Sequence, residues 1–116
     1  MHFKLIIALV SDAQTTRIMD AAREAGATGA TVLNQARGEG IMHSKTFLGL
    51  NLEAQRDMLM FLVEEHMCRD ILETIERIGK FEKNPGTGIA FQLDVEDVVG
   101  VKRQVNKLSE KVEKEI

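Results

Sequence analysis

The sequence predicts an α+β fold in which an antiparallel sheet carries two helices on one of its faces. Three observations predict it. The chain has 116 residues, the length of one domain. Each half contains an apolar strand and then an amphipathic helix that ends at a glycine. Each half then continues through a glycine-containing entry into its next strand. This order is the double split βαβ, or ferredoxin-like, sandwich.

The first half begins with the run FKLIIALV at residues 3–10, which is apolar almost throughout, as in a central strand. Ser11 or Asp12 can then cap a helix. From residue 13 to residue 25, apolar residues recur at helical spacing, and a glycine ends the helix. Residues 29–33 predict the second strand.

The second half repeats this order. The segment DMLMFLV at residues 57–63 predicts the third strand. Residues 67–78 predict the second amphipathic helix, closed by Gly79. After a break at Asn-Pro-Gly-Thr-Gly, residues 89–93 predict a fourth strand and residues 95–101 a fifth.

Two further segments belong to this single domain of residues 1–116, whose core spans residues 3–99. Residues 37–57 lose periodicity and contain several glycines, which predicts a long functional loop. Residues 100–116 place valine and leucine in a four-three-four rhythm between charged residues. That pattern predicts an amphipathic C-terminal helix, which packs either on its own subunit or on a neighbour.

Composition excludes several classes of function. The formal net charge is −3 and there is no Trp or Tyr, so we expect no nucleic-acid partner. A single cysteine, Cys68, permits no cysteine zinc site within one subunit and favours a reducing compartment. The apolar run at residues 3–10 is too short to insert into a membrane. We therefore expect a cytoplasmic protein.

No pattern of residues indicates catalysis or a metal centre. The chain has no nucleophile elbow, zinc-protease motif or Walker loop, which predicts a protein that is not an enzyme. His66 follows Glu64 and Glu65 and could form one corner of a metal site. The favoured interpretation is that the two acids cap the second helix. Cys68 lies on the apolar stripe of that helix and is interpreted as a small core residue.

Three motifs carry a resemblance to a known family. They are GATGATV at residues 26–32, RGEG at residues 37–40 and GTGIAFQLDVEDV at residues 86–98. In type, order and spacing they resemble the P-II family of nitrogen regulators, and the likeness covers residues 3–101. The resemblance implies a trimer with nucleotide bound in clefts between subunits. The half-covered sheet points the same way, because copies of the chain can cover its open face.

The resemblance also implies the site residues. Residues 37–57 correspond to the T-loop, which docks into partners such as membrane transporters and cytosolic enzymes, and residues 80–89 correspond to the phosphate-holding B-loop. Glycines in such loops let backbone N–H groups approach an anion closely. The implied ligand-binding residues are Thr31, Gly38, Gly40, Gly86, Thr87, Gly88 and Lys102. Within the loop, the residues expected to contact a partner are His43, Lys45, Phe47 and Leu48.

The sequence departs from the family pattern at charged positions. The family places a lysine directly after the B-loop Gly-x-Gly and basic residues on the last strand, where this chain has Ile89, Gly100 and Lys102. Ile41 and Met42 replace an arginine and a glutamine of the T-loop. Loss of these contacts should weaken triphosphate binding. The expected ligand is a mono- or diphosphate nucleotide, another small anion or a ligand different from that of the family.

Three functional hypotheses follow, the third of which is a purely structural trimeric scaffold that binds neither nucleotide nor metal. The leading one is a non-enzymatic regulatory protein that binds a small anionic ligand between subunits. It would signal through the loop in nitrogen regulation or in control of a transporter. It needs no cofactor, and an adenine nucleotide would act as its effector. The alternative is a metal-handling trimer like the CutA proteins, which share the fold.

Overall fold

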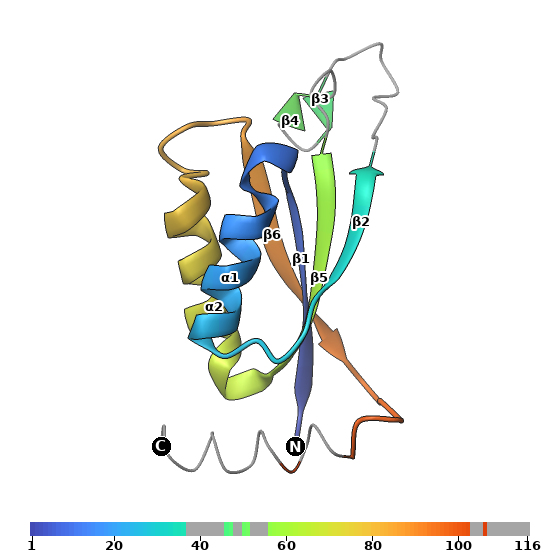
Figure 1. Ribbon diagram of the computed structural model, residues 1–116. Coiled ribbons are helices and arrows are strands. Elements are labelled where there is room, and N and C mark those ends of the chain that lie inside the picture. The colour runs from blue at the N-terminus through green and yellow to red at the C-terminus, as the bar shows by residue number, and fades with distance from the viewer. Residues whose placement is uncertain (37–45, 48–49, 52–55, 103–105, 107–116) are drawn as a thin grey trace.

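The computed structural model describes residues 1–36, 46–47, 50–51, 56–102 and 106. Figure 1 shows one layer of strands and one layer of helices. The elements are β1 (Phe3–Ser11), a short 3-10 helix (Asp12–Gln14), α1 (Thr15–Ala25), β2 (Thr31–Ala36), β3 (Thr46–Phe47), β4 (Leu50–Asn51), β5 (Arg56–Glu64), α2 (Glu65–Gly79) and β6 (Gly88–Val95).

The four long strands form an antiparallel sheet in the order β2-β5-β1-β6. Both helices pack on the same face of this sheet (Figure 1). β2 and β6 are therefore the two edges, and β1 and β5 lie between them. This topology confirms the ferredoxin-like double split βαβ sandwich. Among the described residues, no helix is long and apolar enough to cross a membrane.

Alternation along β1 explains why the helices cover one face. Ile6, Ala8 and Val10 are fully buried, and they point to the helix layer because successive strand residues face opposite sides. α1 contributes Ile18 to this core, and α2 contributes Ile71 on its apolar stripe. The remaining core residues are Phe3, Ala22, Ala27, Leu59, Phe61, Val63, Met67, Cys68, Ile75 and Phe81.

The opposite side of the sheet, which we call the open face, carries no helix among the described residues. It contains Leu5 and Ile7 of β1, which are half-buried in the single chain. Register partners in antiparallel strands share a face, so the pairings identify the rest of it. Between the strand ends, the open face consists of Leu5, Ile7, Leu9, Thr31, Leu33, Met58, Met60, Leu62, Ile89, Phe91 and Leu93. All of these but Thr31 are apolar. The same pairings continue the face to Phe3, Glu64 and Val95 at one end and to Ser11 and Arg56 at the other.

The predicted fifth strand is wrong. β6 runs from Gly88 to Val95, and residues 96–99 belong to no strand. The reason is that Val95 already pairs with Phe3, the first residue of β1, so a longer strand would have no partner. Val99 is 90% exposed, although its apolar side chain suggested a buried strand position.

The C-terminal boundary of the predicted loop is also wrong. Arg56, which the sequence pattern places in the loop, begins β5, and Asp57, which the resemblance includes in the T-loop, belongs to the same strand; both are buried. Asp57 accepts a hydrogen bond from the Thr15 hydroxyl at 2.5 Å, so its carboxylate is satisfied inside the protein. Of the loop itself, β3 and β4 form a two-residue pair. Residues 37–45, 48–49 and 52–55 lie outside the described residues.

The predicted cap at the start of the first helix is wrong: α1 begins at Thr15 after the short 3-10 helix, and neither Ser11 nor Gln14 makes a side-chain capping hydrogen bond.

The C-terminal ends of the helices follow the predictions with one difference. Gly26 ends α1 with a φ of 129°, a conformation that favours glycine. α2 includes Gly79, and Lys80 takes the left-handed conformation after it. Of the predicted C-terminal helix, Gly100 and Val101 are not helical, Lys102 and Asn106 are helical, and residues 103–105 and 107–116 lie outside the described residues.

Gly88 is predicted to be required for packing. A β-carbon at this position would lie 2.3 Å from Cε1 of the buried Phe81 ring, so the ring would have to move. We expect Gly88→Ala to lower the free energy of unfolding by about 1–3 kcal/mol, as overpacking does. Denaturant unfolding monitored by circular dichroism measures this change.

Gly29→Ala is the matched control, because a β-carbon there meets nothing within 4 Å. It should be neutral or slightly stabilising. Combining Gly88→Ala with Phe81→Leu should recover part of the loss, since the smaller side chain gives room. Equal stability of the Gly88→Ala and Gly29→Ala proteins would contradict the packing argument.

Candidate functional site

The Gly86–Gly88 loop connects α2 to β6 and is shaped by local hydrogen bonds. The Asn84 carbonyl accepts from the Thr87 hydroxyl at 2.7 Å and from the Thr87 N–H at 3.3 Å. Gly86 has a φ of 84°, so the turn at this position requires glycine. The predicted B-loop residues are thus held together in one tight turn at the edge of the sheet.

Arg56 holds the same loop from the neighbouring part of the sheet. Its Nη1 donates to the Thr87 carbonyl at 2.6 Å, and its Nη2 donates to the Gly86 carbonyl at 2.8 Å. Arg56 is only 7% exposed, and this burial lowers the pKa of its guanidinium. Sequence reasoning missed Arg56 because it placed this residue in the preceding loop.

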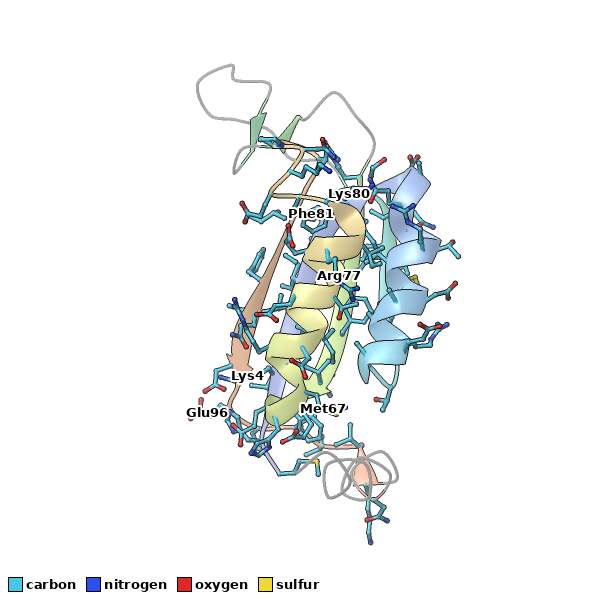
Figure 2. All side chains as sticks on the ribbon, turned by 90° about the vertical axis from the view of Figure 1, so that its left-hand side faces the viewer. Lys4, Met67, Arg77, Lys80, Phe81 and Glu96 are labelled. Atoms are coloured by element: carbon cyan, nitrogen blue, oxygen red, sulfur yellow. The ribbon has the colours of Figure 1, made fainter. Side chains whose placement is uncertain are left out.

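Phe81 supports the loop from the helix side. Figure 2 shows it at the C-terminal end of α2, at the opposite end from Met67. Its ring lies close to both Gly79 and Gly88, since β-carbons on these glycines would come within 2.2 and 2.3 Å of it. The glycines therefore have two roles: Gly86 permits the turn, and Gly88 makes room for Phe81.

Two hollows lie beside the predicted ligand residues. The larger, of about 630 Å³, lies between the Gly86–Gly88 loop and α2, which contributes Arg69, Glu73 and Glu76. The smaller, of about 260 Å³, is lined by Thr31 together with Phe3, Thr28, Gly29, Ala30, Met60, Leu62 and Val101. Thr31 is exposed, and the exposed Lys102 follows Val101 directly.

One chain does not bring the predicted ligand residues together. Thr31 lies on the edge strand β2, while Gly88 lies on the opposite edge strand β6. Three strand spacings separate the two edges, which is roughly 14 Å. Gly38 and Gly40, the other predicted ligand residues, lie outside the described residues. Each chain therefore carries two parts of the candidate site on opposite edges.

The predicted partner-binding residues are mostly undescribed. His43, Lys45 and Leu48 lie outside the described residues. Phe47 belongs to β3 and pairs with Leu50 of β4.

The cluster Glu64, Glu65 and His66 is a helix cap. Its ligand atoms lie within 4.8 Å of one another, as a metal site would require. However, the buried Glu64 accepts a hydrogen bond from the His66 backbone N–H at 2.8 Å and contacts His66 Nδ1 at 2.5 Å. This geometry confirms the predicted capping of α2. The side chain best placed to bind a metal is thus already engaged.

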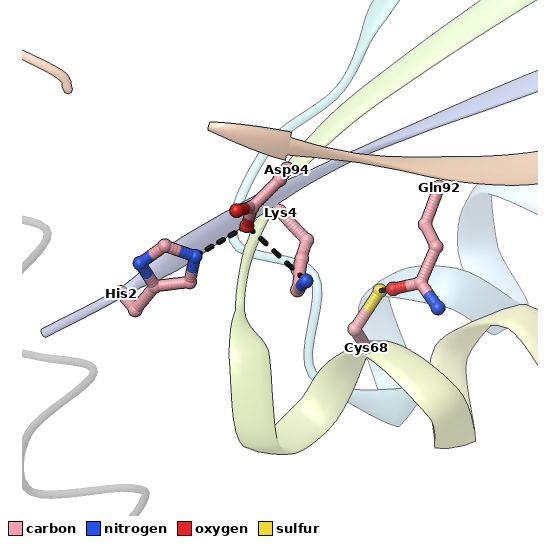
Figure 3. Close-up of polar contacts among 5 residues, drawn as sticks. All are labelled: His2, Lys4, Cys68, Gln92 and Asp94. Atoms are coloured by element: carbon pink, nitrogen blue, oxygen red, sulfur yellow. Dashed lines mark hydrogen bonds and ion pairs between the residues drawn. The ribbon is translucent and has the colours of Figure 1, made fainter. Parts of the chain in front are cut away.

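A second polar cluster joins the ends of β1 and β6. Figure 3 shows the Asp94 carboxylate between His2 and Lys4, with Lys4 Nζ at 3.1 Å. The hydrogen bond from His2, and then the one from Lys4, lower the pKa of Asp94. Beside them, Cys68 Sγ contacts Gln92 Oε1 at 2.9 Å (Figure 3), and burial raises the pKa of the Cys68 thiol. Cys68 is a core residue, as predicted.

Comparison with known families identifies the chain. The sequence profile of the nitrogen regulatory protein P-II family matches residues 3–105, most of the chain. The chain belongs to this family. This confirms the resemblance drawn from the three motifs. No curated protein matches the chain.

Solved structures of P-II-like proteins share the fold of this P-II family member. The apo form of CPII, a nitrogen regulatory PII-like protein from Thiomonas intermedia, superposes with a TM-score of 0.63 at 21% identity, covering 82% of this chain and 90% of CPII. A putative PII-like signaling protein from Thermus thermophilus gives 0.60 at 23% identity, covering 82% and 87%. CPII bound to ADP, AMP and bicarbonate gives 0.61 at 20% identity, covering 82% and 91%.

The Glu64–His66 pair is predicted to make stability depend on pH. The hydrogen bond to Glu64, and then the charge of Glu64, raise the pKa of His66 above its ordinary value of 6.5. Folding thus favours the protonated imidazole, so the pair stabilises the protein below the ordinary value and loses this effect as pH rises through the raised value. We expect His66→Gln to lower the melting temperature at about pH 5.5 and to have less effect at about pH 9. The effect should be small, because the His66 side chain is 58% exposed.

Glu64→Gln provides the matched background, since an amide oxygen can still accept the backbone bond while the charge is gone. In that background the effect of His66→Gln should no longer depend on pH. If His66→Gln in the wild-type background lowers the melting temperature equally at both pH values, the ion pair contributes nothing to stability.

Proposed function

We propose that this protein is a non-enzymatic, trimeric regulator that binds an adenine nucleotide of the mono- or diphosphate type in clefts between subunits. Binding would control its interaction with a partner protein through residues 37–55. Three features support the proposal: the apolar open face, the two parts of the candidate site on opposite edges, and the glycine loop held by Arg56.

The open face favours assembly. Apolar surface in water costs roughly 25 cal/mol for each Å², and between the strand ends this face carries ten apolar side chains on four strands. Leu33 and Leu93, near its two edges, are 49% and 48% exposed in the single chain. Copies of the chain arranged around an axis would cover these side chains.

A cyclic arrangement also completes the site. In a ring, one edge of each subunit meets a different edge of its neighbour, because the contact is head-to-tail. The β2 edge with Thr31 would then face the β6 edge with Gly86–Gly88. The apolar hollow beside Thr31, with Met60 and Leu62, suits a flat base, and the glycine loop suits phosphate oxygens.

The charges near the loop favour a small number of phosphates. Ile89 stands where the family has a lysine, and α2 places Glu73 and Glu76 along the adjoining hollow. Arg69 of the same hollow pairs with Glu73 at 2.9 Å, so the repulsion of a further phosphate would come mainly from Glu76. The CPII structures with ADP and AMP show that a P-II-like fold accommodates such nucleotides. Bicarbonate, which is also present in a CPII structure, is a second ligand to test.

The kind of partner protein is inferred from membership of the P-II family. P-II proteins are nitrogen regulators, and we propose that this chain acts on a membrane transporter or a cytosolic enzyme. It would work in the cytoplasm, where a buried thiol such as Cys68 stays reduced. Elemental analysis of the purified protein tests the alternative of CutA-like metal handling.

The trimer is predicted to depend on the open face. Leu93→Glu places a carboxylate among apolar side chains, which is costly when the face is covered. The wild type should show a trimeric mass by light scattering at micromolar concentration, and Leu93→Glu should show a smaller mass with an unchanged circular dichroism spectrum. Thr16→Glu, an exposed position on α1, is the control and should stay trimeric. A monomeric wild type would defeat the proposal.

The nucleotide preference is predicted to change with one residue. Isothermal titration of the wild type should show binding of ADP that is tighter than binding of ATP. Ile89→Lys restores the family's cation beside the loop at one end of the open face; with light scattering confirming that it stays trimeric, it should tighten ATP binding roughly tenfold, as a hydrogen bond to a charged group does.

Ile89→Met is the matched control, since it keeps an apolar side chain of similar size and should leave both affinities unchanged. Binding of neither nucleotide by the wild type would rule out the proposed ligand. An Ile89→Lys protein with unchanged ATP affinity would show that the phosphates lie elsewhere.

A further inference from the structure

Arg56 is the first residue of β5 and lies between the ends of two neighbouring strands. Its backbone pairs with Ala36 of β2 on one side and with Ser11 of β1 on the other. From there the buried side chain reaches the turn before β6, 30 residues further along the chain. A side chain anchored in this way presents its donors with little freedom to move.

The two hydrogen bonds fix which way the loop peptides face. Arg56 draws the carbonyls of Gly86 and Thr87 toward itself, at 2.8 and 2.6 Å. In a trans peptide the carbonyl and the next N–H point in opposite directions, so the N–H groups of Thr87 and Gly88 face away from Arg56. The Thr87 N–H meets only a long contact, 3.3 Å, to the Asn84 carbonyl, which a ligand oxygen can replace.

The planar guanidinium suits this task. Its fork of N–H donors can bind two neighbouring acceptors at once, which an ammonium group does less well. Hydrogen bonds from a charged donor are also short and strong, as the distance of 2.6 Å to Thr87 shows. The buried positive charge lies directly behind the loop, on the side opposite to the N–H groups that it turns outward.

We propose that Arg56 is a positioning residue for anion binding: it holds the Gly86 and Thr87 carbonyls inward, so that the loop presents its N–H groups to the phosphate of a nucleotide. The ligand part of this inference rests on the proposed function. The positioning part concerns the loop itself and can be measured without ligand.

Amide hydrogen exchange of the intact protein tests the positioning part. Arg56→Met removes both hydrogen bonds and should speed exchange at residues 86–88 by roughly tenfold. Arg17→Met is the matched control: Arg17 Nη2 also donates to a backbone carbonyl, that of Ile78, at 3.0 Å, but away from the loop. It should leave exchange at residues 86–88 unchanged. Unchanged exchange in Arg56→Met would overturn the inference.

Titration with ADP tests the ligand part. Arg56→Met should weaken ADP binding roughly tenfold or more, with Arg17→Met matching the wild type. Arg56→Lys keeps the charge but not the fork, so its exchange rates and affinity should lie between those of wild type and Arg56→Met. It serves as the deciding variant if Arg56→Met does not fold, and a fully wild-type Arg56→Lys protein would then overturn the inference.

The two failures can be told apart. No ADP binding by the wild type would defeat the proposed function, while the exchange rates would still decide whether Arg56 positions the loop. A lower melting temperature of Arg56→Met with an unchanged ADP dissociation constant would assign Arg56 to stability alone and overturn its role in binding.

Discussion

The central constraint on this protein is that two helices cover only one face of a four-stranded sheet. Strand alternation places Ile6, Ala8 and Val10 against the helices, and it necessarily places Leu5, Ile7 and Leu9 on the other side. A chain of this length has no further helix in its described residues to cover that side. Its apolar surface and its two edge strands are therefore available together, and both the proposed assembly and the divided candidate site rest on them.

The glycine loop shows how a site without side-chain charge can still be rigid. Gly86 is required by its backbone conformation, whereas Gly88 is required because Phe81 fills the space of its side chain. Arg56 and Phe81 hold the loop from two sides, from β5 and from the end of α2. A glycine-rich turn has many accessible backbone conformations. Contacts with Arg56 and Phe81 restrict them, so the protein loses less conformational entropy when a ligand binds the loop.

Much of the fold could be predicted from the sequence, because the apolar run at residues 3–10 indicates a central strand and the periodicity of residues 67–78 reports which side of the helix is buried. The start of β5 could not, since Arg56 and Asp57 are polar and their partners lie 30 and 42 residues away. Residues 95–101 look like a strand locally, but a strand also needs a partner, and β1 begins at Phe3. Local pattern likewise could not show that Thr31 and Gly88 lie on opposite edges. Which strands form the edges depends on the order of strands in the sheet. Thr31 and Gly88 were selected only because their motifs resemble those of the family.

The change from a lysine to Ile89 alters how positive charge reaches the candidate site. A lysine after the glycines would contact phosphate directly and from the front, where each added phosphate oxygen gains a partner. Arg56 acts from behind: its two Nη atoms donate to the Gly86 and Thr87 carbonyls, while its buried Nε has no hydrogen-bond partner among the described residues. Its contribution is therefore nearly the same for one phosphate or several, because it passes through a fixed number of peptide N–H groups. A site of this kind would gain little from a third phosphate, and Glu76 in the adjoining hollow would oppose one. The proposed preference for a shorter nucleotide would thus follow from where the charge is held as much as from how much charge was lost.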